Sequence, residues 1–326
     1  MTIRIRYSLV IGAACASALG AAPPAVAQEK FPSRPIEIVV PAAVGGGNDI
    51  TSRILAEIME PTLGQKLVVL NKPGAAGAFG MAAILQAKPD GYTVGSIWNA
   101  PLTMAPHLQS TLPKPGEYTP ILLYTSSPTI LCVKAAFPAS DGKGFVEELR
   151  KNPNKYTYGN DGVGGVLHLA TERVFLKLGV KARPVPFGGA GETLKNFLGD
   201  HIDIYGGSIL PVLPYAKDKS AKCLMVTSAE RNAAVPDAAG LAELGAPGEA
   251  TALWRGMIAP KGLPADRLAL LQKAFSDAAL SPRFREFMQQ RGEEAKGTSS
   301  AEFRELIFTE YEAMGKVMVA IGLLKK

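Results

Sequence analysis

Residues 31–54, FPSRPIEIVVPAAVGGGNDITSRI, decide the fold of this 326-residue chain. The apolar run Ile36–Val40 predicts a short buried strand. Glycines 45–47 then permit a turn with exposed backbone amides, because glycine has no Cβ to block positive φ. Asn48 or Asp49 can cap the helix that follows. This arrangement brings free N–H groups and the positive end of a helix dipole to one point, which favours the binding of an anion.

The first 27 residues have the three parts of a secretory signal: a positive start, an apolar run and small residues before a cleavage site. We expect cleavage after Ala27, which leaves Gln28 as the first residue of an exported protein. A membrane anchor needs about 20 apolar residues, and the run 7–22 is shorter and is followed by prolines. Lipid attachment at Cys15 would cut that run in half.

Composition excludes some partners. The formal charge is +6, and removal of Arg4 and Arg6 leaves 33 of the 35 basic residues against 29 acidic ones, a charge of +4. The basic residues form no stripe, so nucleic acid is not an expected partner. Cys132 and Cys223 stay in the exported chain, each in an apolar run. They can form one disulfide or remain two buried thiols, and the sequence leaves both possibilities open.

Strand-like and helix-like segments alternate along the exported chain, which predicts α/β layers. The apolar stretch 121–133 is long enough to cross between two domains. The last quarter is helical, with Ser281 starting one helix and Ser299 with Glu302 forming a capping box for the last, which we expect to end at Ala320. Two α/β lobes joined by crossing strands, with terminal helices packed on the first lobe, fit this order.

Two further glycine-rich turns follow strand-like segments. One is YGNDGVGGVLH at 158–168, which leads into a helix, and the other is FGGAG at 187–191. Open α/β sheets bind ligands at the carboxyl ends of their strands, so these turns are candidates for a binding site. The turn at 45–47 and the turn at 158–168, one on each lobe, can face each other across the ligand.

Other chemistry is poorly supported by the residues. His168 and Glu172 are four residues apart, but His107 and His201 have no matching metal-ligand spacing. Ser208 lacks the closing glycine of a nucleophile elbow, and the glycine runs fit neither nucleotide-binding motif. We therefore expect no catalysis, cofactor or metal. Arg255 could pair with a ligand carboxylate or could simply be a solvated arginine.

An ordered set of motifs resembles one family. The motifs are FPSRPI at 31–36, GGGND at 45–49, NKPGA at 71–75, PDGYT at 89–93, HLA at 168–170, VPF at 185–187, VTSAER at 226–231 and WRG at 254–256. In this order they resemble the Bug (TctC-like) family of extracytoplasmic solute receptors, over essentially the whole exported chain. These receptors serve tripartite tricarboxylate transporters of Gram-negative bacteria.

The resemblance implies a two-lobed type II periplasmic binding protein fold that closes over its ligand. We expect a first domain of residues 28–122 and 229–326 and a second of residues 123–228. The implied function is non-enzymatic capture of a di-, tri- or aromatic carboxylate in the periplasm and delivery of this ligand to the membrane subunits of the transporter. The receptor is expected to be a monomer. A ligand sensor feeding a two-component kinase is the alternative. A secreted hydrolase and an effector domain of a transcription regulator fit the sequence less well.

Binding in the family relies on backbone amides, small hydroxyl groups and waters from two facing turns. Carried over by position, the implied contacts in the first lobe are Ala43, Val44, Gly46, Gly47, Asn48, Asp49, Ala75 and Asn99. Those in the second lobe are Asn160, Asp161, Gly164, Gly165, His168, Phe187, Gly188, Gly189, Ala190, Tyr205 and Ser208. Asp49 is expected mainly to cap its helix and to brace the turn.

Several positions depart from the family pattern. Ala42 and Val44 replace a usual Phe and Pro, and Gly188 replaces a usual Lys. At the second turn, Asn160 and Asp161 stand where Ser, Ala or Thr is common, and Gly165 replaces a frequent Ser. These changes open space, and Asp161 would repel a second ligand carboxylate unless a hydroxyl, an amine or a proton intervenes. A bulkier or aromatic carboxylate is therefore a hypothesis for the ligand.

Overall fold

The computed structural model describes residues 31–42, 44, 47–74, 77–187 and 190–325. By its contacts the chain divides into two units, Met1–Phe31 and Pro32–Lys326, and all helices and strands given below belong to the second. The predicted export signal and its cleavage site lie outside the described residues.

The first sheet is built on the strand that the opening stretch predicts. β1 (Ile36–Val40) pairs in parallel with β2 (Leu67–Asn71) on one side and β3 (Thr93–Trp98) on the other. β9 (Ala252–Pro260) pairs antiparallel with β3, and β4 (Tyr118–Lys134) pairs antiparallel with β9. Ile36, Ile38 and Val40 on one face of β1 are completely buried, and Val39 on the other face is 2% exposed, because helices cover both faces of the sheet.

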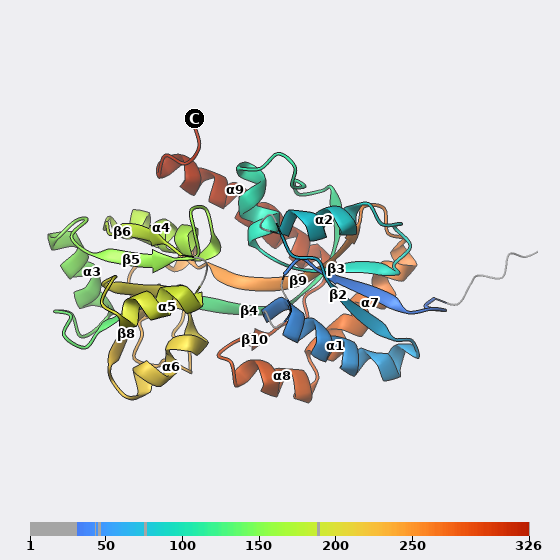
Figure 1. Ribbon diagram of the computed structural model, residues 1–326, viewed down its shortest axis with the longest axis horizontal. Coiled ribbons are helices and arrows are strands. Elements are labelled where there is room, and N and C mark those ends of the chain that lie inside the picture. Colours follow the sequence, from blue (N-terminus) through green and yellow to red (C-terminus); the bar gives the residue numbers. More distant parts are fainter. Residues whose placement is uncertain (1–30, 43, 45–46, 75–76, 188–189, 326) are drawn as a thin grey trace, which may run out of the picture. The chain divides into compact units, whose positions relative to one another are not determined.

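Helices from both ends of the chain cover this first sheet (Figure 1). α1 (Gly47–Leu63) packs with α7 (Ala265–Ala279), and α2 (Ala78–Leu85) shares an apolar cluster with α9 (Ser300–Ala320). α8 (Pro282–Gln289) leads into the short strand β10 (Glu294–Ala295), which pairs with β4. The C-terminal helices thus pack on the first lobe, as predicted. Gly256 in β9 allows this approach, because a Cβ there would overlap the Phe303 ring of α9.

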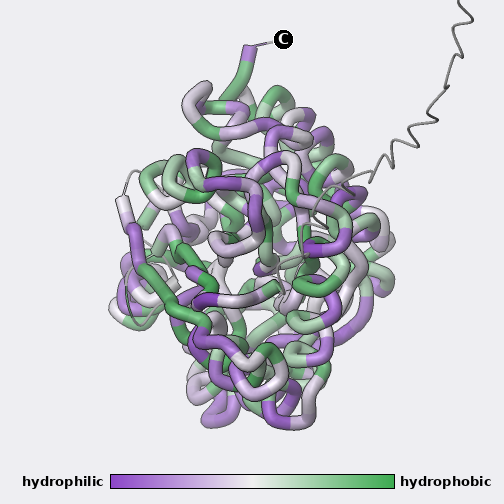
Figure 2. The backbone as a smooth tube through the Cα atoms, turned by 90° about the vertical axis from the view of Figure 1, so that its right-hand side faces the viewer, coloured by the Kyte–Doolittle hydropathy of each residue, from purple (hydrophilic) through white to green (hydrophobic). Residues whose placement is uncertain are grey.

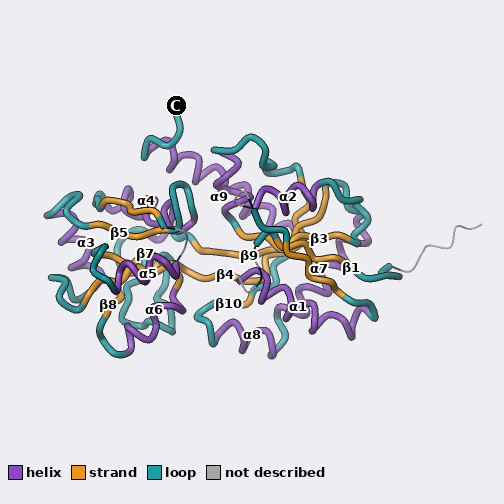
Figure 3. Tube along the Cα trace, in the orientation of Figure 1, coloured by secondary structure: helices purple, strands orange, loops and turns teal. Residues whose placement is uncertain are grey.

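β4 is a single 17-residue strand that belongs to both sheets. Its first part pairs with β9 and β10, and its last part, from Thr129 to Lys134, lies between β7 (Ile204–Ser208) and β8 (Ala221–Val226). Figure 3 shows β4 and β9 as the strands that run from one group of helices to the other. The apolar stretch 121–133 therefore crosses between the sheets, whereas the domain boundaries at 122 and 228 stay a prediction.

The second sheet repeats the layered arrangement. β7 pairs in parallel with β5 (Thr157–Asn160), and β5 with the edge strand β6 (Arg183–Pro186). α3 (Gly142–Lys151) and α4 (Val166–Leu178) supply one apolar cluster against this sheet. α5 (Ala190–Leu198) and α6 (Ile209–Lys217) supply a second cluster. The mixed α/β, two-lobed class predicted from the sequence is confirmed.

The edge strand β6 carries two prolines. The amides of Arg183 and Phe187 donate to the Tyr156 and Asn160 carbonyls of the β5 side. Since strand residues alternate in direction, the intervening Pro184 and Pro186 lie at positions that face away from β5. Proline has no N–H group, so these outward positions offer no backbone donor.

Predicted helix caps fare differently. Ser281 accepts a hydrogen bond from the Phe284 amide at the start of α8, and Ser299 forms the full capping box with Glu302 at α9, as predicted. The prediction for α1 is wrong. This helix begins at Gly47, so Asn48 and Asp49 lie within its first turn and not at the N-cap position before it.

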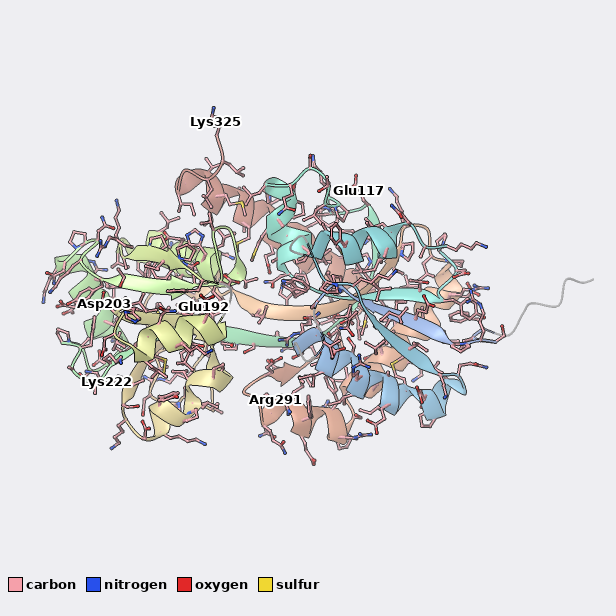
Figure 4. All side chains as sticks on the ribbon, viewed as in Figure 1. Glu117, Glu192, Asp203, Lys222, Arg291 and Lys325 are labelled. Atoms are coloured by element: carbon pink, nitrogen blue, oxygen red, sulfur yellow. A yellow bond between two sulfur atoms is a disulfide. The ribbon has the colours of Figure 1, made fainter. Side chains whose placement is uncertain are left out.

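Polar and apolar residues alternate along most of the chain. In Figure 2 the hydrophilic and hydrophobic segments are interspersed along the tube. Within the described part of the chain, every helix is too short or too polar to cross a membrane. Charged side chains of both signs, such as those of Glu117, Asp203 and Lys325, project from the periphery (Figure 4).

A disulfide joins two paired strands of the second sheet. Cys132 of β4 and Cys223 of β8 are register partners and are bridged, although they lie 91 residues apart in the sequence. Both sit in the cluster covered by α5 and α6, and Cys132 is completely buried. The structure thus decides between the two possibilities that the sequence left open.

Replacing both cysteines, Cys132→Ser with Cys223→Ser, should lower the free energy of unfolding by about 2–4 kcal/mol, because the unfolded chain loses the constraint of a long closed loop. Denaturant unfolding of the wild type and the double variant, each with and without reductant, measures this. The reductant should destabilise only the wild type. Equal stability of the two proteins in the absence of reductant would show that the bridge contributes nothing.

Candidate functional site

Two strand–turn–helix units place helix N-termini at the carboxyl ends of parallel strands. In the first lobe β1 leads to α1, and in the second β5 leads to α4. We call residues 41–49 the first turn and residues 160–168 the second turn. Of the predicted contacts, Ala43, Gly46, Ala75, Gly188 and Gly189 lie outside the described residues. The others are placed below.

The first turn rests on an arginine. A Cβ added to Gly47 would lie 2.6 Å from Nη2 of Arg255, so the guanidinium group lies directly against the backbone where α1 begins. Nε of Arg255 donates to Oδ1 of Asn48 at 3.2 Å, and Nη1 pairs with the Glu293 carboxylate. The Arg255 side chain is only 8% exposed. Arg255 is therefore a buried, paired support of the turn, and its charge is already balanced inside the protein.

A network of buried hydroxyl groups contacts the N-terminal residues of α1. The Tyr124 hydroxyl lies 2.9 Å from the Ser96 hydroxyl and 3.1 Å from the Thr51 hydroxyl. Asn48 reaches this group through Nδ2, which donates to Ser96 at 3.5 Å. All four side chains are buried. Burial also raises the pKa of Tyr124, more than the nearby Arg255 lowers it, so the phenol stays neutral. The network fixes the orientation of the α1 N-terminus.

The remaining described residues of the first turn differ in exposure. Asp49 is buried and pairs with Arg53, one helical turn on, at 2.8 Å. This pair balances its charge, in keeping with the predicted bracing role. Val44 is 73% exposed, and Phe79 at the start of α2 is 64% exposed with its ring over Gly74. The first turn therefore offers helix amides and exposed apolar surface, and both of its buried charges are paired.

Asn99, a predicted contact, belongs to a buried cluster around Glu310. Its Nδ2 donates to the Ala252 carbonyl at 2.9 Å and to Oε1 of Glu310 at 3.0 Å. Thr103 donates to the same oxygen at 2.9 Å, and Nε1 of Trp254 donates to Oε2 at 2.7 Å. Burial raises the pKa of Glu310 against the lowering effect of these donors. The cluster ties α9 to β9 close to where β9 leaves the first sheet.

In the second turn, Asp161 occupies the N-terminus of α4. Its Oδ1 accepts hydrogen bonds from the amides of Leu167 at 3.0 Å and His168 at 3.3 Å. Gly165 makes room for this carboxylate, because a Cβ at that position would overlap Oδ1. Burial raises the pKa of Asp161, and the amide hydrogen bonds oppose that rise. The amides that a bound anion would use are already taken by the protein's own carboxylate.

His168 is a neutral member of the second turn. Its Nδ1 accepts a hydrogen bond from the Gly164 amide at 3.0 Å, so the ring proton of the neutral form is on Nε2. Burial lowers the pKa of His168, which keeps the ring uncharged. Glu172, one turn further along α4, accepts from the Tyr158 hydroxyl at 2.6 Å, and burial raises its pKa. His168 is therefore buried and hydrogen-bonded within the second turn.

Asn160 is the last residue of β5, and only one of the two polar atoms of its side chain has a hydrogen-bond partner among the described residues. Oδ1 accepts from the Gly162 amide at 2.9 Å, whereas Nδ2 is buried and has no partner among the described residues. Asn160, His168 and Glu172 line a pocket of about 570 Å³ between α4, β6 and the segment that follows α9. Phe175 and Pro184 are among its apolar walls. The second turn thus combines polar side chains with an apolar pocket.

The other predicted contacts of the second lobe lie beside this turn. The Phe187 amide donates to the Asn160 carbonyl at 3.1 Å, and Ala190 begins α5. Tyr205 is completely buried with its ring over Gly207, and its hydroxyl donates to the Ser208 carbonyl at 2.9 Å. Ser208 precedes α6 and is partly exposed. Gly164, at φ +77°, lets Leu108 approach, since a Cβ there would lie 2.8 Å from it.

Sequence reasoning missed the residues that support the site. Glu293, Glu310, Tyr124 and Ser96 were not singled out, yet they orient the first turn and Asn99. Each meets its partners far along the chain, for example 211 residues apart for Asn99 and Glu310. An isolated glutamate in an amphipathic helix gives no local signal of burial. Only its distant partners in the folded chain reveal its role.

Comparison with known families identifies the chain. The model of the TctC family, described as "Tripartite tricarboxylate transporter family receptor", matches residues 51–323. This chain belongs to the TctC family. As a TctC-family receptor it is a periplasmic solute-binding protein and not an enzyme, as the resemblance implied. Among the described residues, no three His, Cys, Asp or Glu side chains form a group that could hold a metal ion.

Relatives of this receptor cover nearly its whole length. A UPF0065 protein of Bordetella pertussis is 31% identical over 296 residues, which is 90% of this chain and 92% of that protein. The crystal structure of a TctC solute-binding protein from Polaromonas is 28% identical, covers 88% of this chain and 99% of its own, and has a TM-score of 0.78. MatC from Rhodopseudomonas palustris, with bound malate, is 27% identical, covers 88% of this chain and 99% of its own, and has a TM-score of 0.71.

The contact between Gly47 and Arg255 predicts that Gly47→Ala destabilises the receptor by about 1–3 kcal/mol, because the new methyl group must displace a buried guanidinium group. Gly248→Ala is the matched control, since a Cβ there meets nothing within 4 Å and surface changes stay within about 0.5 kcal/mol. Denaturant unfolding of both variants measures the difference. Equal stability of the two variants would contradict the described contact.

The burial of Glu310 predicts a pH-dependent contribution to stability. Since its pKa is raised in the folded state, folding binds a proton at this carboxyl, and the stabilisation is fully present below the unfolded pKa of about 4.3. The stability of the wild type relative to Glu310→Gln should therefore fall as pH rises above that value. Glu312→Gln changes an exposed carboxylate of the same helix and serves as the control. A difference that grows with pH would contradict the raised pKa.

Proposed function

We propose that this receptor captures an organic carboxylate between its two lobes and delivers it to the membrane subunits of a tripartite tricarboxylate transporter. The observation that carries the proposal is the α1 N-terminus at the first turn. There the helix dipole points at the turn, while Arg255 and Asp49 are both paired within the protein. An oriented set of backbone amides without a competing charge is suited to a carboxylate.

The known ligand of one relative supports the same chemistry. MatC, which shares 27% identity and the fold, holds malate. The proposed contacts are those carried over from the family to the two turns, with Asn48, Val44 and the α1 amides on one side and Asn160, His168 and Phe187 on the other. Tyr124, Ser96 and Thr51 hold Asn48 and the α1 N-terminus in place.

Capture requires the two turns to approach each other. The proposed lobes are residues 28–122 with 229–326, and residues 123–228, joined by β4 and β9. Closure shifts the population toward a form that the membrane subunits recognise.

We further propose export with cleavage after Ala27 and function as a monomer.

A thermal-shift screen of residues 28–326 tests the proposed function. The panel contains aliphatic diacids, tricarboxylates, acidic amino acids and aromatic carboxylates. A carboxylate that binds the folded state should stabilise it by about 2.7 kcal/mol at a hundredfold excess over its dissociation constant, a rise of several degrees in melting temperature.

Gly47→Ala provides the control in this screen, because it disturbs the first turn and should reduce the shift, whereas Gly248→Ala should keep it. Neutral analogues, in which an amide replaces the carboxylate, should give no shift. A panel without a single stabilising acid, or amides that stabilise as well as acids, would refute carboxylate capture.

A further inference from the structure

The second turn differs from the first in the sign of its charge. At the first turn the two buried charges, Arg255 and Asp49, are each balanced by a partner, and the α1 dipole remains positive. At the second turn Asp161 brings a full negative charge to the N-terminus of α4, where the dipole supplies only about half a positive charge. His168 is held neutral by its hydrogen bond from Gly164. The second turn therefore carries a net negative charge.

The position of Asp161 depends on Gly165. Oδ1 of Asp161 occupies the space that a Cβ of residue 165 would need, so any other residue there would push the carboxylate away from the Leu167 and His168 amides. Asp161 and Gly165 act together, because the glycine leaves open the space that the carboxylate fills.

We propose that Asp161 and Gly165 make this receptor selective for a monocarboxylate whose far end donates a hydrogen bond through an amine or a hydroxyl group. The inference rests on the proposed function, in which the first turn binds the carboxylate. A second ligand carboxylate at the second turn would meet a carboxylate of like charge and would find the α4 amides already in use. An ammonium or hydroxyl group would instead donate to Asp161.

Groups beside Asp161 can also contact the ligand. Glu172 lies on the same face of α4 as His168, in a pocket that Asn160 and Lys181 also line. Nδ2 of Asn160 is a buried donor without a partner among the described residues, and it can accompany a hydroxyl oxygen of the ligand. Val163, on the same turn, is 62% exposed and offers apolar contact to the body of the ligand.

Two series of related ligands, which differ in the group at the far end, test the selectivity by isothermal titration calorimetry. The aliphatic set is glutarate, 4-aminobutanoate, 4-hydroxybutanoate and butanoate, and the aromatic set is terephthalate, 4-(aminomethyl)benzoate, 4-hydroxybenzoate and benzoate. In at least one set, the amine or hydroxyl acid should bind the wild type at least tenfold more tightly than the diacid. A tenfold ratio corresponds to about 1.4 kcal/mol.

The variant Asp161→Asn removes the charge while an amide oxygen still accepts from the α4 amides. It should narrow the preference for the amine or hydroxyl acid over the diacid by at least tenfold, mainly through tighter binding of the diacid. Asp161→Ser is a second variant, with a hydroxyl group that also suits the helix start, in case the first does not fold. Asp218→Asn is the control, since it removes an exposed carboxylate of the same lobe at the far end of α6 and should leave the preference unchanged.

The outcomes separate this inference from the proposed function. If the wild type prefers the diacid, or if Asp161→Asn binds with the wild-type ratio, the selectivity is refuted while carboxylate capture stands. If the Asp218→Asn control changes the ratio as much as Asp161→Asn, a general charge effect replaces the specific one and the inference falls. If no acid of any class binds, both proposals fail together.

Discussion

The pairing of β4 with strands of both sheets is the constraint on which the rest of the structure depends. One continuous strand meets β9 and β10 at one end and β7 and β8 at the other. Neither sheet can form its full set of backbone hydrogen bonds without it, so the two lobes share a single element. The first turn follows β1 and the second follows β5, which lie on opposite sides of β4 in the strand order. Any change in the separation of the two turns must therefore be absorbed where β4 and β9 pass between the sheets (Figure 3).

The site is built from compensated charges. Arg255 has Glu293, Asp49 has Arg53, and Glu310 has three neutral donors. An unpaired buried charge is costly, so such pairing is expected on grounds of stability alone. Its functional effect is that the first turn presents dipoles and amides, whose geometry is rigid and whose net charge is small. Asp161, like Glu310, has neutral donors in place of a charged partner, and these donors are the amides at the start of α4.

Local patterns predicted local structure well. The strand Ile36–Val40, the cap of α8 and the capping box of α9 all follow from a few neighbouring residues, and the resemblance supplied the two-lobed class. The start of α1 was misplaced because glycine at 47 enters the helix. What sequence could not predict were the contacts of long range. Arg255 meets Asn48 across 207 residues, and Asn99 meets Glu310 across 211.

The two prolines of β6 have a consequence for how this protein behaves when many copies are crowded together. A bare sheet edge is a template on which a second chain can add a strand, the first step towards fibrous aggregation. At the outer edge of β6 an incoming strand would find carbonyl acceptors but no donors at Pro184 and Pro186, so half of the ladder could not form. The sheet is thereby closed to growth at its last strand.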